Sequence, residues 1–297
     1  MLDDFKQAFH RQNNAHVQLI IINVVVFLAL AVLKVFSFIF QAETFFVLLH
    51  HQLAIPAAFA DFIQKPWTII TYAFVHDLSG IFHILFNMLV FYWFGRLFAE
   101  YLGSDKLVAV YVLGFLAGGV AFLLAYNLIP YYQQNIPTGG MVGASAAVNA
   151  VVVACATLVP NYTFYLLFLG PVRIKYIAAF FIILSFIGTV GTNAGGNVAH
   201  LGGALIGYLY IRQLQAGINW GGWITITLDW FKQIFKPDAK VKVSYRSQRK
   251  RPKENRRPSP DRISQDEIDA ILDKISAGGY ESLTREEKEK LFNASKK

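Results

Sequence analysis

Polar side chains interrupt three of the apolar stretches in this sequence, and their types suit acyl-transfer chemistry. They are His83 and Asn87 in one stretch, Ser145 and Asn149 in a second, and His200 in a third. A histidine can take the proton of a serine hydroxyl while the serine oxygen attacks a carbonyl carbon. Because a polar side chain is costly inside a membrane, each of these residues is a functional candidate. The set predicts Ser145 as a nucleophile and His200 as its base.

The segment around Ser145 suits an oxyanion site. Ser145 lies in GGMVGASAA (139–147), with Gly143 and Ala146 close to it, where a glycine-rich loop is predicted to turn into a helix. The first turn of a helix presents unpaired backbone N–H groups and the positive end of the helix dipole. These groups can stabilise the oxyanion that forms when the serine attacks.

Two further spacings bring other groups to this serine. His83 and Asn87 are four residues apart and therefore lie on one helix face, from which both can donate hydrogen bonds to the same oxyanion. Gly203 and Gly207 follow His200 at the small-xxx-small spacing that lets two membrane helices pack closely. We therefore expect the backbone of the histidine to approach the helix that carries the serine.

Six long apolar segments are available to carry these side chains. The 297-residue chain is 55% hydrophobic and 15% charged, whereas a soluble domain has roughly 25% charged residues. A membrane-spanning helix needs about 17–25 residues. The segments that reach or approach this length cover approximately residues 17–40, 81–98, 106–128, 143–159, 174–190 and 197–213. The predicted fold is all-α, a polytopic membrane protein with a six-helix bundle.

Charges in the loops predict the orientation of this bundle. One set of loops carries Lys6, Arg11, Arg96, Lys106, Arg173 and Lys175, whereas the other set carries only Lys65. Positively charged loops stay in the cytoplasm, so both termini are expected there. Counted from the cytoplasmic helix ends, His83, Ser145 and His200 then lie roughly 18–22 Å into the bilayer. All three are expected in one plane, about 10 Å below the outer surface of the bilayer core.

Other membrane-protein functions lack their usual residues in this sequence. The acidic residues between positions 16 and 213 are Glu43, Asp61, Asp77, Glu100 and Asp105, and all fall in loops or at helix ends. This distribution disfavours a proton-coupled transporter or channel and a protease with paired intramembrane aspartates. The sequence has no HExxH zinc motif, and we expect neither a metal nor another cofactor. Cys155, the single cysteine, is expected in the core.

The rest of the chain divides into smaller predicted parts. A cytoplasmic N-terminus at 1–16 precedes the six-helix domain at 17–213, whose apolar 41–80 loop is expected to fold into short interfacial helices. After the bundle come an interfacial amphipathic segment at 214–236, a disordered basic linker at 237–263 and a small cytoplasmic helical hairpin at 264–297. The basic linker is expected to bind anionic lipid headgroups rather than nucleic acid.

Several segments resemble the signature segments of rhomboid intramembrane serine proteases. They are HILFNMLVFYWFG (83–95), GASA (143–146) and AHLGGALIG (199–207), while PWTIITYAFVH (66–76) is similar to the segment before that family's second span. The resemblance covers about residues 17–213, with the motifs in the family's order. It implies a bacterial-type rhomboid fold with a Ser145–His200 dyad, and an oxyanion hole made by His83, Asn87 and the Ser145 amide.

The resemblance also implies a substrate class and a location. We expect a serine endopeptidase in the bacterial inner membrane that cleaves single-pass or polytopic membrane proteins near the outer leaflet. The alternative is a catalytically silent rhomboid-like protein that binds membrane clients, although such relatives typically lose the serine or the histidine. Three positions depart from the family pattern: Ala146 stands where glycine is common, Asn149 where an aromatic residue is common, and Thr68 where an arginine often follows the tryptophan of the first loop. We expect Asn149 to hydrogen-bond to His200.

Two groups of polar residues outside this set have simpler predicted roles. The remaining histidines, His10, His16, His50, His51 and His76, lie in loops or at the terminus and are expected on the solvated surface. The stretch GTNAGGN (191–197) is either a flexible gate beside the site or an ordinary turn.

Overall fold

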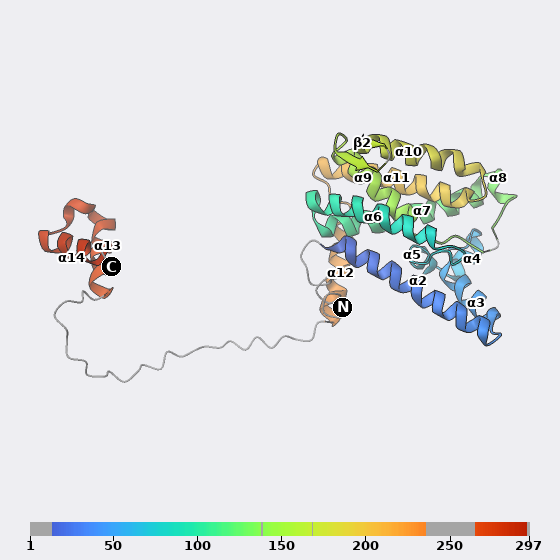
Figure 1. The fold of residues 1–297 in the computed structure, drawn as a ribbon, viewed down its shortest axis with the longest axis horizontal. Helices are drawn as coiled ribbons and strands as arrows, with labels where there is room; N and C mark the ends of the chain where they lie inside the picture. The colour runs from blue at the N-terminus through green and yellow to red at the C-terminus, as the bar shows by residue number, and fades with distance from the viewer. Residues whose placement is uncertain (1–13, 138, 168, 236–264, 296–297) are drawn as a thin grey trace. The chain divides into compact units, whose positions relative to one another are not determined.

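The computed structural model describes residues 14–137, 139–167, 169–235 and 265–295 (Figure 1). The chain forms two compact units, residues 1–237 and 238–297. The predicted basic linker at 237–263 lies outside the described residues, as does most of the predicted N-terminal segment at 1–16.

The first unit is a bundle built from the six predicted apolar segments. Its main helices are α2 (Ala15–Ile39), α6 (Ile81–Leu102), α7 (Ser104–Leu128), α9 (Ser145–Leu158), α10 (Ile174–Ile187) and α11 (Ala194–Gln215). By length and composition α2, α6 and α7 can each cross a membrane, whereas α9 and α10 are shorter apolar helices. These helices confirm the prediction of an all-α membrane bundle.

Short elements connect the bundle helices. They are α3 (Glu43–Leu53), α4 (Phe59–Gln64), α5 (Thr68–Thr71), α8 (Pro130–Gln133) and the 3-10 turn η1 (Gly188–Val190), while α12 (Gly222–Phe235) follows the last bundle helix. Figure 1 shows α3, α4, α5 and α8 at one end of the bundle, with α12 at the other end. The 41–80 segment therefore folds into short helices, as its sequence predicts.

A small antiparallel hairpin interrupts the otherwise helical unit between α9 and α10. Strand β1 (Thr163–Leu166) pairs with β2 (Gly170–Arg173), so that Thr163 lies opposite Arg173 and Leu166 opposite Gly170. Gly170 has φ +69°, a backbone conformation that a residue with a side chain rarely adopts. The sequence predicts only a loop here. In the described residues, β1 and β2 form the one sheet in an otherwise helical fold.

Helix α9 is the centre of the unit. Eleven consecutive residues, from Ala146 to Ala156, are buried, and α7 and α11 pack against this helix and against each other. Figure 1 places α2 at one edge of the bundle and α10 at the other. Helix α9 has 14 residues, so it is roughly 21 Å long and shorter than the hydrocarbon core of a bilayer. At least one end of α9 must therefore lie within the core of the bilayer.

Small residues let the neighbouring helices approach α9 very closely. A Cβ atom on Gly203 would lie 2.1 Å from the carbonyl oxygen of Ala146, and one on Gly207 would lie 2.2 Å from that of Ala150. Side chains cannot occupy such short distances, so backbone meets backbone between α11 and α9. This contact confirms the close approach that the glycine spacing predicts.

Hydrogen bonds fasten the α3–α5 segment to the bundle. The side chain of Asn127 on α7 donates to the carbonyl of Ala57 (2.9 Å) and accepts from the amide of Phe59 (3.0 Å). Backbone bonds in both directions join Ile55 to Met141, at 3.1 and 2.9 Å. The glycine-rich loop before α9 is thus held by the short helices that precede α6.

The second unit is a helical hairpin made of α13 (Gln265–Gly278), η2 (Tyr280–Ser282) and α14 (Arg285–Ser295). Its buried apolar side chains include Ile271 on α13 and Leu283, which lies between η2 and α14. Thr284 and Glu287 bond reciprocally, each backbone amide donating to the other's side chain, which is a capping box. The salt bridge from Lys274, together with the Thr284 amide, lowers the pKa of Glu287 to about 2.

We expect Gly207→Ala to destabilise the bundle. Its methyl group would collide with the Ala150 carbonyl, and overpacking of this kind costs about 1–3 kcal/mol or more. The measurement is thermal unfolding in detergent micelles. The matched control is Gly222→Ala, where the nearest atom to a new Cβ lies 3.7 Å away. Equal melting temperatures for the two variants would contradict a packing role for Gly207.

Candidate active site

The predicted nucleophile and base meet in the structure. Ser145 is the first residue of α9 and His200 lies in the second turn of α11. The Nε2 atom of His200 is 2.7 Å from the Oγ atom of Ser145, which is hydrogen-bonding distance. Both side chains are half-buried. A histidine in this position can accept the serine proton without any movement of either helix.

The other nitrogen of His200 also has a partner, which the sequence analysis missed. Nδ1 lies 3.3 Å from the hydroxyl oxygen of Ser185 on α10, and Ser185 is 4% exposed. Nothing in the sequence distinguishes this serine from a structural one, because it stands alone in an apolar helix. Both ring nitrogens of the candidate base are thus engaged by hydroxyl groups.

Asn149 does not make its predicted bond to His200. Its side-chain amide instead donates to the carbonyl of Ser145, one turn earlier in α9, at 2.9 Å. A carbonyl four residues back is the nearest acceptor for a short polar side chain on a helix. Asn149 still lines a cavity with Ser145 and His200. The side-chain contact to His200 that we expected of Asn149 is made by Ser185 instead.

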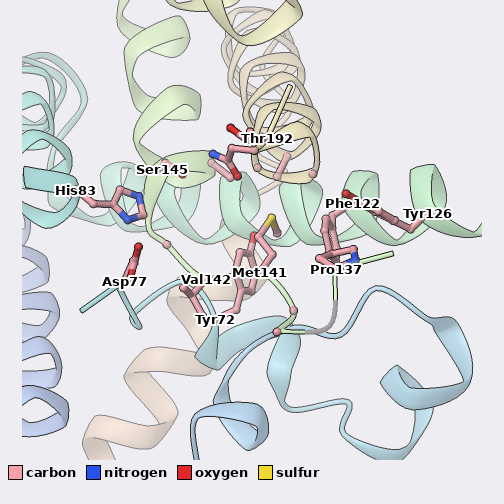
Figure 2. Close-up of a pocket in the computed structure, with 18 of the residues that line it drawn as sticks. Tyr72, Asp77, His83, Phe122, Tyr126, Pro137, Met141, Val142, Ser145 and Thr192 are labelled. Carbon is pink, nitrogen blue, oxygen red and sulfur yellow. The ribbon is translucent and has the colours of Figure 1, made fainter. Parts of the chain in front are cut away.

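His83 and Gly143 lie beside the Ser145 hydroxyl. Gly143 has φ +134°, and a Cβ atom there would lie 3.2 Å from Cε1 of His83 and 3.6 Å from Oγ of Ser145. Figure 2 shows the His83 ring directed at the loop that leads into Ser145. The backbone of Gly143 is held by a bond from its amide to the Tyr72 carbonyl, at 2.9 Å. The predicted histidine therefore faces the predicted oxyanion region.

Asn87 lies one turn below His83 on the same face of α6, as predicted. It is buried, and its amide nitrogen donates one hydrogen bond to the His83 carbonyl at 2.9 Å. An amide group has two N–H donors, so one remains for a ligand. Of the other predicted residues, Ala146 is buried directly after Ser145, while Gly203 and Gly207 set the α9–α11 distance.

Two cavities share Ser145 and His83 in their walls. The first has a volume of about 590 Å³ and is lined by the glycine-rich loop, Tyr72, Phe122 and Tyr126 (Figure 2). The second, of about 440 Å³, lies between α6 and α10 and is lined by Phe86, Phe181 and Leu184 together with the dyad. Ser145 is thus accessible from both cavities.

Two histidines expected on the surface are buried. His16 is 8% exposed beneath Tyr92, with ring centroids 5.8 Å apart. His76 is fully buried, and its ring centroid is 5.4 Å from that of His83 in an edge-on contact. The prediction was wrong for His16 because it lies on the buried side of the first turn of α2, and for His76 because the end of the 41–80 segment packs into the bundle. His76 therefore helps to hold the His83 ring in place.

Carboxylates are absent from the hydrogen bonds around the dyad in the described part of the chain. Asp77 lines the first cavity, but its two oxygens accept from the amide and hydroxyl of Ser79, at 2.8 and 2.6 Å. These bonds lower the pKa of Asp77, so it remains ionised and occupied. The chemistry available to the site is that of a serine–histidine pair with a neutral hydroxyl behind the ring.

Comparison with known proteins places most of this site in one family. Residues 64–215, just over half of the chain, match a family model described as Rhomboid domain. Residues 260–297 match a family of unknown function. The first match contains every residue of the candidate site, whereas His16 lies before it.

Similar curated proteins carry rhomboid names. The chain is 32% identical over 160 residues to RHOMBOID-like protein 12, mitochondrial, of Arabidopsis thaliana, covering 50% of this chain and 47% of that protein. It is 30% identical over 181 residues to Rhomboid protein 1, mitochondrial, of Saccharomyces cerevisiae, covering 54% and 49%. The chain thus spans about half the length of these relatives. From the domain match and the apolar helices, we conclude that the chain belongs to the rhomboid family and is an integral membrane protein.

Proposed function

We propose that this chain is an intramembrane serine endopeptidase that uses Ser145 and His200 as a catalytic dyad. The 2.7 Å contact between His200 Nε2 and Ser145 Oγ carries this proposal. Family membership supports it, since the Rhomboid domain match covers both residues. The alternative, a silent client-binding protein, would not require this contact.

The reaction would follow the geometry of the pair. His200 Nε2 takes the hydroxyl proton as Ser145 Oγ bonds to the substrate carbonyl carbon. The oxyanion lies near the Ser145 amide, His83 and the free N–H of Asn87. His200 then gives the proton to the leaving amine as the peptide bond breaks. The other half of the substrate remains bound to Ser145 as an ester. Water, deprotonated by His200, hydrolyses that ester and restores the serine.

The position of the site favours membrane-protein substrates cut near one end of a transmembrane helix. Ser145, His83 and His200 all lie near the first residues of their helices. The cavity between α6 and α10 has apolar walls and suits a segment that arrives from the lipid. A substrate helix must unwind to expose its peptide bonds, so helix-breaking or small residues at the cut site are favoured.

The orientation proposed from the loop charges puts both termini in the cytoplasm and the site near the outer leaflet. The sequence resemblance alone favours a bacterial inner membrane, whereas the two relatives described above carry mitochondrial names. The basic residues at 240–262 are proposed to bind anionic headgroups of the cytoplasmic leaflet.

We expect Ser145→Ala and His200→Ala each to abolish cleavage of a model transmembrane substrate while the proteins still express. His83→Ala and Asn87→Ala should retain some activity, because other oxyanion donors remain. Cleavage is measured on gels with enzyme and substrate in detergent, and mass spectrometry locates the cut near the outer end of the substrate helix. Persistent cleavage by Ser145→Ala would exclude this mechanism, and an inactive native protein would favour the client-binding alternative.

We expect Gly143→Ala to slow the reaction of Ser145 with a fluorophosphonate probe at least tenfold. Its methyl group would press on the His83 ring, and alanine is strained at φ +134°. The control is Gly139→Ala in the same loop, where a Cβ atom meets nothing within 4 Å. Labelling rates that match between the two variants would refute a role for this close approach.

We expect truncation after residue 236 to leave cleavage of a model substrate largely intact. The second unit forms a compact hairpin of its own, and none of its residues is proposed to take part in the reaction. Melting temperature and turnover of truncated and full-length enzyme are compared in detergent. Unchanged melting with lost turnover would contradict this expectation, whereas a large fall in melting temperature would indicate that the hairpin stabilises the bundle.

A further inference from the structure

Ser185 is the one polar residue on the buried face of α10. The buried residues of this helix are Ile174, Ala178 and Ser185, and their spacing places them on one face. The other residues of α10 that are not lysine or tyrosine are apolar, and most are exposed. A hydroxyl group at 4% exposure in such a helix needs a hydrogen-bond partner. The partner that the structure gives it is His200.

The direction of the bonds around His200 follows from what each group must do. For Ser145 to be activated, its hydroxyl must donate to Nε2 across the 2.7 Å contact. A neutral imidazole with a bare Nε2 carries its hydrogen on Nδ1. Nδ1 must therefore donate across the 3.3 Å contact, and the Ser185 oxygen accepts.

Proton transfer makes this acceptor more important. When His200 takes the serine proton, both ring nitrogens carry hydrogen and the ring becomes positively charged. Each N–H then needs an acceptor, because an unpaired donor in a buried site is costly. In the described part of the chain the Ser185 oxygen lies within hydrogen-bonding distance of Nδ1, whereas the buried side-chain oxygen of Asn149 makes no hydrogen bond to the ring.

The geometry points to Ser185 as a positioning residue, whose oxygen accepts the Nδ1 hydrogen of His200 and so keeps Nε2 directed at Ser145. This inference rests on the proposed dyad. It assigns to a neutral hydroxyl on α10 the orienting task that a carboxylate performs in a serine–histidine–aspartate triad. A hydroxyl stabilises a cationic ring less than a carboxylate does, so slow turnover is the expected consequence.

The test compares Ser185→Ala, Ser185→Thr and a control, Ser37→Ala, in the full-length protein in detergent. Ser37 lies on α2 and is 5% exposed, so it matches Ser185 in burial and residue type. Two quantities are measured: the second-order rate of fluorophosphonate labelling of Ser145 as a function of pH, and kcat and KM for a model transmembrane substrate. Melting temperatures are recorded for every variant.

We expect Ser185→Ala to lower the labelling rate and kcat about three- to tenfold, the factor that corresponds to one neutral hydrogen bond. KM should change less than about twofold, because Ser185, although it borders the second cavity, is 4% exposed and its hydroxyl contacts the base. The acid limb of the labelling profile, which follows protonation of the His200 ring, should move to lower pH because the protonated ring loses an acceptor. His83 is present in every variant and so does not cause a difference between them. Ser185→Thr keeps the hydroxyl and should restore the acid limb.

Three outcomes would overturn the inference. Unchanged labelling and an unmoved acid limb in Ser185→Ala would show that the hydroxyl does not orient the ring. A loss of rate with an unmoved acid limb and a fallen melting temperature would assign Ser185 to packing alone. An equal loss of labelling rate in Ser37→Ala and Ser185→Ala would also assign Ser185 to packing alone. Failure of the unmodified protein to label or cleave would instead reject the proposed dyad itself.

Discussion

The contact between the backbones of α9 and α11 fixes the relative positions of the groups around Ser145. Gly203 and Gly207 face the carbonyls of Ala146 and Ala150 at distances that leave no room for a side chain. Ser145 directly precedes one end of this contact, and His200 lies one turn before Gly203 in α11. The serine–histidine distance therefore depends on two packed backbones. Changes of side-chain rotamer affect this distance less, because hydrogen bonds to both ring nitrogens hold the histidine ring in one orientation.

Much of this arrangement was readable in the sequence because the membrane environment restricts where polar and small residues occur. A histidine or asparagine in an apolar segment is costly, so the few present mark the site. The glycine spacing after His200 predicts a close helix contact, which the structure confirms. The lengths of the six apolar segments likewise predict the six main helices, although the boundaries shift by a few residues.

The remaining features depend on which face of each helix contacts its neighbours, and the residues of one segment alone do not determine that. Ser185 carries no signal, since a serine in an apolar helix can face lipid, a neighbouring helix or its own backbone. The bond predicted for Asn149 was wrong because its own helix offers a nearer acceptor. His76 was predicted at the surface, yet it is fully buried against His83, at the end of the segment of short helices before α6. The β1–β2 hairpin depends on a turn at Gly170 that composition alone does not reveal.

For the proposed protease activity, the close α9–α11 contact has a consequence for substrate selection. In induced fit, the binding energy of a good substrate drives the assembly of the reacting groups. Here these groups are already assembled, so induced fit cannot distinguish good substrates from poor ones. Discrimination must then precede chemistry, in the free energy needed to unwind a helix and bring its backbone into the cavities beside Ser145. Such an enzyme would rank substrates by local helix stability more than by the shape of individual side chains.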